Sequence, residues 1–484
     1  MSLSLVLAPP LAASLLAIVA RRQIRFVGWT SVVLNAVSLA ASGWMCADVL
    51  WRDATITAAN GFWRVDALSA LLALCVSAVT LLASAFGPGL GEADEFEVAQ
   101  ARRFRVFVNA FALMMLLAVT TNNVGFMWVT IEATTITSAV VIPLHRTKSS
   151  VEASWKYLLI CSVGIALAFA GTVLAYFDFV ATAGRLPDAL NWTVLREAAP
   201  SLNRDLMQLA FAFIVVGYGT KAGLAPMHTW LPDAHSEAPA PMSAMMSGVL
   251  LAVAMYAVVR WKAVVDVTLG PSFAGNLLIA AGLLSVIVGS LSLVIQRHYK
   301  RMLAYSSVEH IGLVSVGLAL GPLGTFAALL HLVNHAVAKS MAFLLSGRIL
   351  QRYQTTEIAG VSGLLRAMPW TGSLFTIAVL ALAGLPPFGL FVSEFLLVRA
   401  AVRTGHVWLA AVVLALVLVA FVSLFNHLNR MLYGPVPDGI ALGEARGWRV
   451  LTLAGWAGVS VVLGLVLPWP VTGLIERTVQ AITP

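Results

Sequence analysis

The stretch HLVNHAVAKSMAFLL, residues 331–345, sets His331, His335 and Lys339 inside an otherwise apolar run. These side chains are four residues apart, so on a helix of 3.6 residues per turn they lie on one face at successive turns. A charge at the centre of a membrane helix costs roughly 2.5–3.5 kcal/mol on insertion scales, and such residues usually face a bundle interior or a water-filled cavity. The alternative is two structural histidines and a lysine that reaches the interface. The apolar residues 340–347 that follow Lys339 favour a buried proton or ion path.

Composition places the chain in a lipid bilayer. Of the 484 residues, 60% are hydrophobic and 11% are charged, whereas soluble domains carry roughly 25% charged residues. The formal net charge is +8, but the basic residues stand in short loops beside apolar runs, so we expect no nucleic-acid partner. Cys46, Cys75 and Cys161 stand singly without CxxC spacing, which excludes an iron–sulfur or zinc site of the usual kind. We therefore expect no metal and no cofactor in this chain.

The apolar runs predict an all-α polytopic membrane protein with about 14 transmembrane helices. The predicted spans lie near residues 3–20, 26–47, 65–86, 104–119, 122–144, 155–180, 207–225, 239–263, 273–295, 302–320, 322–349, 372–398, 406–432 and 449–474. Loops after the odd-numbered spans carry about 18 Lys and Arg, and loops on the opposite side carry about 10. Basic loops stay on the cytoplasmic side, so we expect both termini outside a bacterial-type inner (cytoplasmic) membrane.

Two of these spans contain helix-breaking residues in similar places. Span 7 runs into GTKAGLAPMHTWLPDAHSEAPAP, residues 219–241, and span 12 contains AGLPPFGLFVSEF, residues 383–395. Matching broken helices indicate an inverted-repeat transporter, although ordinary proline kinks in a bundle are the alternative. The breaks are five spans apart, which predicts two inverted five-helix repeats. The expected divisions are an N-terminal three-helix segment, the first repeat (spans 4–8), the second repeat (spans 9–13) and a C-terminal helix 14, at residues 1–103, 104–263, 273–432 and 449–484.

Four ionisable residues then line up within the predicted membrane spans. Glu132 lies in span 5, Lys221 at the break of span 7, Lys339 within span 11 and Glu394 just after the break of span 12. The order acid, base, base, acid predicts a proton relay, because small changes in hydration or pairing alter the protonation of buried groups. We expect Glu132 and Lys221 to form a switchable ion pair.

Other ionisable residues are weaker candidates. Asp66 opens span 3 and Asp178 closes span 6, so their positions at span boundaries explain them best. Glu309 and His310, in AYSSVEHIG, are auxiliary candidates for the relay. Two histidines in MHTWLPDAHSEAP either guard an aqueous entrance or cap broken-helix ends. They are His228 and His235.

Four segments carry a family resemblance: KAGLAPMHTWLPDAHSEAPAPMSA, RMLAYSSVEHIG, HLVNHAVAKSMAFL and GLPPFGLFVSEF. They resemble the antiporter-like proton-translocating subunits shared by respiratory complex I, multisubunit Na⁺/H⁺ antiporters and membrane-bound hydrogenases. The resemblance covers roughly residues 60–435. Within that family, YSSVEHIG and WKYLLICSVGIALAFAGTV are most similar to the F subunit of hydrogenase-4, a hydrogenase of the formate-hydrogenlyase type.

The resemblance implies fourteen helices, two inverted repeats and a hydrated charged axis along the membrane plane. It matches Glu132, Lys221, Lys339 and Glu394 to the family's axis residues, with His331 and His335 beside the span-11 lysine. It also implies other membrane subunits and a peripheral redox arm as partners. These partner subunits would hold the nickel–iron and iron–sulfur centres. No dinucleotide fingerprint or P-loop is present, so we expect no redox catalysis in this chain.

One position departs from the family pattern. Many relatives carry a lysine or histidine in span 8, whereas this span offers Ser243, Ser247 and Tyr256. The link between Lys221 and Lys339 would then depend on water, on these hydroxyls, or on the auxiliary pair in span 10. Three alternatives stay open: a Na⁺/H⁺ antiporter subunit, an NADH-quinone oxidoreductase subunit, or a non-conducting membrane anchor for a partner enzyme.

Overall fold

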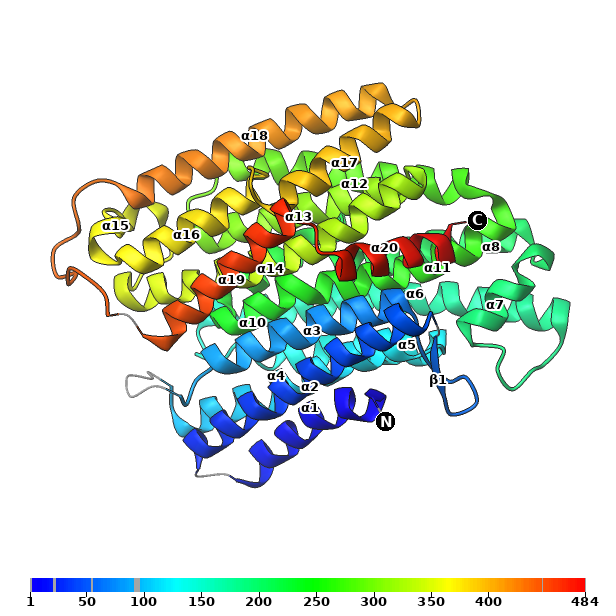
Figure 1. The fold of residues 1–484 in the computed structure, drawn as a ribbon, viewed down its shortest axis with the longest axis horizontal. Coiled ribbons are helices and arrows are strands. Elements are labelled where there is room, and N and C mark those ends of the chain that lie inside the picture. Colours follow the sequence, from blue (N-terminus) through cyan, green and yellow to red (C-terminus); the bar gives the residue numbers. More distant parts are fainter. Residues whose placement is uncertain (1, 21–22, 54, 91–95, 446, 484) are drawn as a thin grey trace.

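The helix that carries residues 331–345, α14 (Gly321–Tyr353), runs through the centre of the bundle (Figure 1). The computed structural model describes residues 2–20, 23–53, 55–90, 96–445 and 447–483. The most apolar 18-residue window of α14 is entirely buried inside the protein. Its neighbours come from distant parts of the chain: α3 (Ala67–Phe86), α10 (Ala240–Met245), α13 (Tyr299–Leu318), α16 (Pro369–Leu382) and α17 (Gly389–Arg403). This position keeps the ionisable face of α14 away from lipid.

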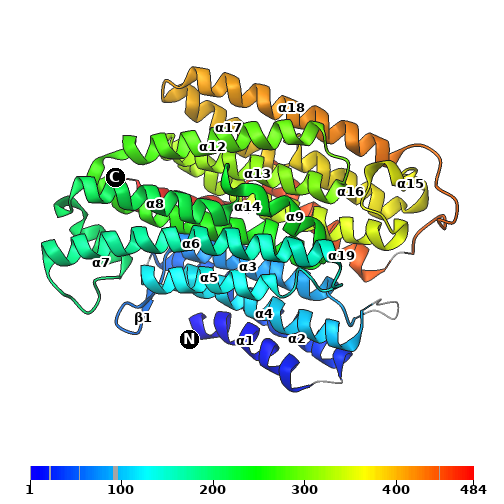
Figure 2. The ribbon, with the colours of Figure 1, turned by 180° about the vertical axis from the view of Figure 1, so that it is seen from behind.

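The other helices lie roughly parallel to α14 (Figures 1 and 2). They are α1 (Ser2–Val19), α2 (Ile24–Arg52), α4 (Val98–Thr120), α5 (Val124–Ala139), α6 (Lys148–Ala183), α8 (Arg204–Ala222), α9 (Trp230–Glu237), α11 (Leu251–Leu269), α12 (Pro271–Val294), α18 (Val407–Leu432), α19 (Trp448–Leu465) and α20 (Trp469–Ile482). At the edge of the bundle, only 33% of the apolar window of α18 is buried. An apolar helix that exposes most of its surface is suited to a lipid-facing position.

The described residues contain eleven helices long and apolar enough to cross a membrane, if α8–α9 and α10–α11 each count as one. This confirms the predicted all-α polytopic membrane fold. Three further predicted spans also coincide with helices but are shorter or more polar. These are α5, with 16 residues; α13, which carries Lys300, Arg301 and Glu309; and the pair α16–α17, with 14 and 15 residues.

One end of the bundle carries structure that the hydropathy pattern did not predict. A short antiparallel hairpin joins β1 (Ile56–Ala58) to β2 (Trp63–Val65), and the short helix α7 (Trp192–Ala198) lies at the same end. Figure 1 shows the start of α1 and the end of α20 on this side as well. The predicted position of both termini outside the membrane stays a prediction.

Both predicted breaks are present and have the same geometry. Helix α8 ends at Gly223 with φ +82°, and α16 is followed by Gly384 with φ +66°, a conformation that glycine adopts without steric cost. The leucine after each glycine donates its N–H to the carbonyl five residues before it, which is the Schellman arrangement for ending a helix. The breaks at spans 7 and 12 are therefore confirmed. The division into two inverted repeats stays a prediction.

The predicted continuous span 449–474 is wrong in one respect. It is two helices, α19 and α20, separated at residues 466–468, because Pro468 lacks the N–H that an uninterrupted helix needs. Helix α19 packs closely on the break of span 12, where a Cβ at Gly464 would lie 2.0 Å from the carbonyl oxygen of Pro387. Both helices also contact α14 (Figure 1), so the end of the chain returns to the centre of the bundle.

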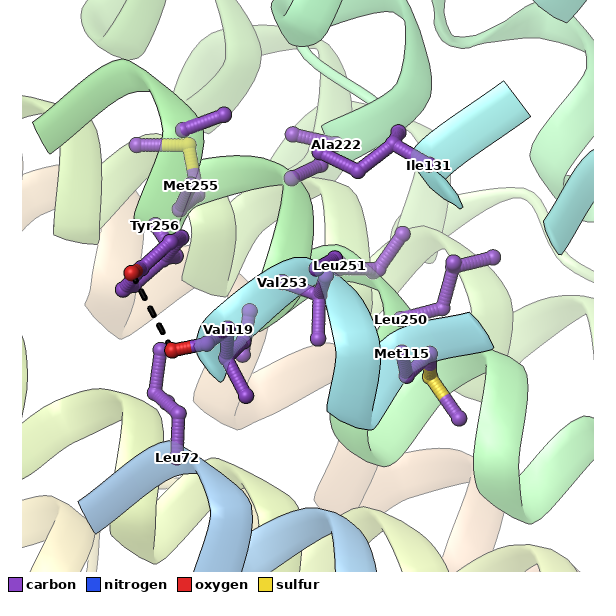
Figure 3. Close-up of a cluster of buried hydrophobic side chains, with 14 of the residues drawn as sticks. Leu72, Met115, Val119, Ile131, Ala222, Leu250, Leu251, Val253, Met255 and Tyr256 are labelled. Atoms are coloured by element: carbon purple, nitrogen blue, oxygen red, sulfur yellow. Dashed lines mark hydrogen bonds between the residues drawn. The ribbon is translucent and has the colours of Figure 1, made fainter. Parts of the chain in front are cut away.

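Span 8 is continuous but irregular. A π-helical turn, Met246–Leu250, separates α10 from α11, and such turns insert an extra residue into the helix. Leu250 and Leu251 pack among apolar side chains from α3, α4 and α5, and the Tyr256 hydroxyl donates to the carbonyl of Val119 at 3.1 Å (Figure 3). This apolar packing fixes the helix between the two halves of the bundle.

A loop between α18 and α19 is held to the bundle by Glu444. Its carboxylate accepts hydrogen bonds from the Thr371 hydroxyl at 2.6 Å, from the Thr371 N–H at 2.9 Å and from the Arg348 guanidinium at 2.7 Å. Burial by itself raises the pKa of Glu444, but the bonds from Thr371 and then Arg348 hold that pKa below the usual value. The loop is thus fixed by an ionised carboxylate.

Candidate functional site

Lys221, the last-turn lysine of α8, is completely buried and is held by two hydroxyl groups. Its ammonium nitrogen donates to the Thr135 hydroxyl on α5 and to the Tyr157 hydroxyl on α6, each at 2.7 Å. The same nitrogen lies 4.8 Å from the centre of the Tyr157 ring. Figure 2 shows α6 and α8 side by side, which brings these side chains together.

Glu132 and Lys221 make no direct contact in this structure, because the Thr135 hydroxyl lies between the two groups. The predicted switchable ion pair stays a prediction. Thr135 accepts from Lys221 and donates to the Glu132 carboxylate at 3.1 Å. A second hydroxyl, from Ser162, donates to the other carboxylate oxygen at 2.7 Å. Glu132 is half-buried, and it contacts the lysine only through a group that can pass a proton in either direction.

The direction of the neighbouring hydrogen bonds follows from counting hydrogens. Ser138 uses its hydroxyl hydrogen on the carbonyl of Thr134 at 2.6 Å, so it accepts from Tyr157 at 2.7 Å. Tyr157 therefore accepts from Lys221 and donates onward. These bonds use two of the three ammonium hydrogens of Lys221 and leave the third for a further acceptor, such as water.

Lys339, near the middle of α14, has an equivalent environment. It is completely buried and donates to the carbonyl oxygen of Leu303 at 2.6 Å and, through a short bond, to the Ser306 hydroxyl, both on α13. Again two ammonium hydrogens are used. Glu309, one turn further along α13, is buried and interacts electrostatically with both Lys339 and Glu394. One of its carboxylate oxygens has no hydrogen-bond partner among the described residues.

Three histidines gather between Lys339 and Glu394. The predicted one-face spacing of His331 and His335 is present, and His310 from α13 joins them. His310 Nδ1 lies 3.0 Å from His331 Nε2, and the rings of His310 and His335 are 5.4 Å apart. His331 Nδ1 lies 3.0 Å from the Ser393 hydroxyl, the residue before Glu394 on α17. The second half of the predicted relay is thus one contiguous cluster of titratable groups.

Tyr256 and His235 lie in surroundings that differ from those the sequence suggested. Neither lysine bonds to Tyr256, whose hydroxyl donates to the carbonyl of Val119 and lies 3.2 Å from the Ser69 hydroxyl. His235 of α9 is completely buried and interacts electrostatically with Lys339. Its ring centre lies 5.3 Å from that of Phe343, with the two rings tilted. Both of its ring nitrogens lack hydrogen-bond partners among the described residues, so it is not an exposed entrance residue.

The hydroxyls of span 8 have separate roles. Ser247 bonds to Ser307 of α13 at 2.8 Å, next to the Ser306 that holds Lys339. Ser243 instead donates to the carbonyl of His235 at 2.9 Å. Of the hydroxyls proposed from the sequence, these two therefore lie near the gap between the lysines.

Asp66 is more than a boundary residue. It caps α3 by accepting from the N–H of Ser69 at 3.1 Å and forms a two-bond ion pair with Arg260 of α11, each bond 2.7 Å long. The Arg260 guanidinium also lies 4.6 Å from the ring centre of Trp192. This buried pair joins α3, α11 and α7 at the hairpin end of the bundle, away from the two lysines.

Two other residues singled out from the sequence lie at helix boundaries or turns. Asp178 accepts from the N–H of Asn203 at 2.8 Å, which agrees with a span-boundary role. His228 lies in the turn Met227–Thr229 between α8 and α9, half-buried, with its ring 6.4 Å from that of Tyr305.

Sequence reasoning missed the hydroxyls that hold the lysines. Thr135 stands three residues after Glu132, the helical spacing that brings two side chains together, and this spacing was a usable signal. Tyr157, Ser306 and Ser393 come from neighbouring helices and had no such signal. Arg260 also had no such signal, because its partner Asp66 is 194 residues away in the sequence.

The fold and these buried groups define an all-α polytopic membrane protein whose ionisable side chains are gathered inside the bundle. Residues 121–419 match the family described as the transmembrane region of NADH:quinone oxidoreductase/Mrp antiporter. This match covers more than half of the chain, and the chain belongs to that family. The family resemblance inferred from the four sequence segments is thereby confirmed.

Individual relatives agree with this membership. The chain is 40% identical over 364 residues to a hydrogenase-4 component F homolog of Methylacidiphilum infernorum, covering 74% of this chain and 76% of that protein. It is 32% identical to hydrogenase-4 component B of Escherichia coli over 69% of this chain and 50% of that protein.

Solved structures support the same fold. A chain of the membrane-bound sulfane sulfur reductase, an archaeal respiratory membrane complex, superposes with a TM-score of 0.88 at 26% identity, covering 99% of this chain and 97% of that chain. A chain of the Mrp complex from Dietzia sp. gives a TM-score of 0.86 at 23% identity, covering 99% of each chain, and is evidence for the fold alone. These relatives are subunits of multisubunit membrane complexes, as the sequence predicted in outline.

Proposed function

We propose that this chain is the proton-translocating, antiporter-like subunit of a redox-driven membrane complex of the hydrogenase-4/formate-hydrogenlyase type. The observation that carries the proposal is the state of the two buried lysines. In the described part of the chain, Lys221 and Lys339 bond to hydroxyl and carbonyl oxygens and make no direct ion pair with a carboxylate. A buried lysine locked to a carboxylate stays charged, whereas neutral partners leave it able to release and regain a proton.

The proposed path begins at Glu132 and passes through Thr135 to Lys221. It continues past His235, and across water, to Lys339. It then passes through the histidine cluster, with His331 and His335 on α14 and His310 and Glu309 on α13, to Glu394. Glu394 is half-buried and follows the break of span 12, so it serves as the exchange point with one aqueous side.

The partners follow from the proposed function. Redox energy comes from a peripheral arm that holds nickel–iron and iron–sulfur centres, and the adjoining membrane subunits connect that arm to this chain. The complex resides in a bacterial-type inner membrane, with both termini of this chain outside. The 40% identity to a hydrogenase-4 component F homolog supports this assignment over the other complexes.

The test is proton uptake by vesicles that contain the purified complex during turnover. Lys339→Ala should remove most uptake while leaving assembly intact, because a methyl group cannot hold a proton and the path ends there. The matched control is Lys262→Ala, since Lys262 pairs with Asp266 on its own helix and lies outside the path. Undiminished uptake by the Lys339→Ala complex would refute the central role.

The same preparation decides among the open alternatives. Nickel and iron–sulfur clusters that co-purify with the chain identify a hydrogenase partner, whereas a flavin-containing partner without nickel indicates an NADH-quinone oxidoreductase. Sodium movement that replaces proton uptake indicates an antiporter subunit. A complex that turns over with neither ion moved indicates a non-conducting anchor.

A further inference from the structure

A compact set of metal-ligating side chains lies at the junction of three helices. His310 of α13, His331 of α14 and Glu394 of α17 each offer one ligand atom, and these atoms lie within 4.8 Å of one another. Both imidazoles are buried and the carboxylate is half-buried. The cysteine spacing predicted no metal site, and this set uses none of the cysteines. It forms only when the bundle is folded.

The orientation of His331 is fixed by Ser393. The Ser393 hydroxyl donates its one hydrogen to the carbonyl of Leu390 at 2.8 Å. It therefore accepts from His331 Nδ1, which lies 3.0 Å away. The neutral His331 ring then carries its hydrogen on Nδ1 and a lone pair on Nε2. Metal-ligating histidines almost always donate their other ring N–H in this manner. His331 Nε2 is the atom that faces His310.

Glu394 is positioned by the backbone of the span-12 break. A Cβ added to Gly384 would lie 2.1 Å from a carboxylate oxygen of Glu394, so the carboxylate rests directly on the glycine. Gly384 has φ +66°, which disfavours other residues there for a second reason. The acid is therefore seated against the histidine pair by a backbone that has little freedom.

The distances suit a small tetrahedral ion. Ligand bonds of about 2.0–2.1 Å place neighbouring ligand atoms of a tetrahedral zinc site about 3.3 Å apart. The nitrogens of His310 and His331 are already 3.0 Å apart, and the carboxylate needs to approach by about 1.5 Å at most. The hydrogen now between the two rings moves to the second nitrogen of His310, so the neutral ring still has one hydrogen.

We propose that His310, His331 and Glu394 form a binding site for one divalent transition-metal ion of the zinc class, with water as the fourth ligand. Two imidazoles and one carboxylate suit Zn²⁺ and Co²⁺ and do not suit Na⁺, Mg²⁺ or Ca²⁺, which require more oxygen ligands. Three protein ligands with water in the fourth position are the arrangement of zinc sites that keep one coordination position open.

The effect of the metal ion on proton transfer rests on the proposed function. The metal ion occupies the same nitrogen and oxygen atoms that the proposed proton path uses between Lys339 and Glu394. Zn²⁺ is therefore an inhibitor of proton transfer through this chain. Binding itself does not depend on that path.

The experiment measures metal binding to the purified complex in detergent, with Zn²⁺ by equilibrium dialysis and Co²⁺ by visible absorption. The wild-type chain should take up one ion with a tetrahedral Co²⁺ spectrum. His331→Gln and Glu394→Gln should each weaken binding by at least 100-fold. Ser393→Ala should weaken it about 10- to 100-fold through the orientation of His331. The matched control, His427→Gln, alters a buried histidine that contacts Leu293 on another face and should bind as the wild type does.

Two results would overturn the site. One is a wild-type complex that gives no tetrahedral Co²⁺ spectrum, a measurement that needs no variant to fold. The other is equal Zn²⁺ affinity in the wild-type and His331→Gln complexes. Proton uptake, measured in parallel vesicles, separates this site from the proposed function. Stoichiometric Zn²⁺ binding with unchanged uptake keeps the metal site and removes these residues from the proton path.

Discussion

The Thr135 hydroxyl is the only described atom that bonds both to Lys221 and to Glu132, so its removal tests how these groups communicate. Thr135→Val keeps the branched shape and deletes the hydroxyl. A hydrogen bond to a charged group contributes about 1.5–3 kcal/mol, and each 1.36 kcal/mol in a barrier is tenfold in rate. If the lost bond stabilises the transfer step, proton uptake should fall about 10- to 100-fold.

The assay is proton uptake by vesicles at equal amounts of assembled complex. Thr135→Ser retains a hydroxyl and should recover much of the rate. Thr137→Val is the matched control, because the Thr137 hydroxyl bonds only to carbonyls of its own helix, at 2.9 and 3.2 Å. In a Glu132→Gln background, Thr135→Val should add little, since both changes interrupt one route. Normal uptake by Thr135→Val, or fully additive losses, would refute the bridged arrangement.

Two further predictions concern stability. Asp66→Asn should lower the unfolding free energy by about 3–5 kcal/mol, because it leaves Arg260 buried without its counter-charge. Asp48→Asn, which breaks a helical pair with the exposed Arg52, should cost under about 1 kcal/mol. Equal melting temperatures of the two variants in detergent would contradict this reasoning. The second prediction follows from the lowered pKa of Glu444: its contribution is fully present above the ordinary value of 4.5 and is lost as the pH falls through the folded-state pKa. Proteolysis of the 433–445 loop should therefore increase on acidification, and Glu444→Gln, which weakens the bonds from Thr371, should remove that pH dependence; an unchanged profile in this variant would disprove it.

Local properties of the sequence were sufficient for the outline of the fold. Hydrophobic runs predicted the helices, because lipid offers no partner for polar backbone groups and only long apolar helices meet that condition. Gly223 and Gly384, each followed closely by proline, predicted the two breaks for the same local reason. The break at Pro468 has no glycine in the left-handed conformation before it, since Leu467 takes that conformation with φ +45°, so its local signal is weaker.

The sequence by itself also determined that some charged residues stand within apolar spans. Lys221, Lys339 and Glu394 stand in apolar surroundings where a charge is costly, and that cost is visible without any structure. The spacing of His331 and His335 followed from helix geometry alone. Each of these inferences needs only the local sequence of a single helix.

Only the tertiary structure decided what each buried group touches. Asp66 meets Arg260 across 194 residues, and Lys339 bonds to Ser306 across 33, because two helices are rotated and shifted so that these side chains face each other. Periodicity fixes which face of a helix is polar, but neither the depth nor the partner of a residue on that face. For this reason the spacing on one helix could pair Thr135 with Glu132, but only the packed helices show that Lys221 bonds to the same hydroxyl.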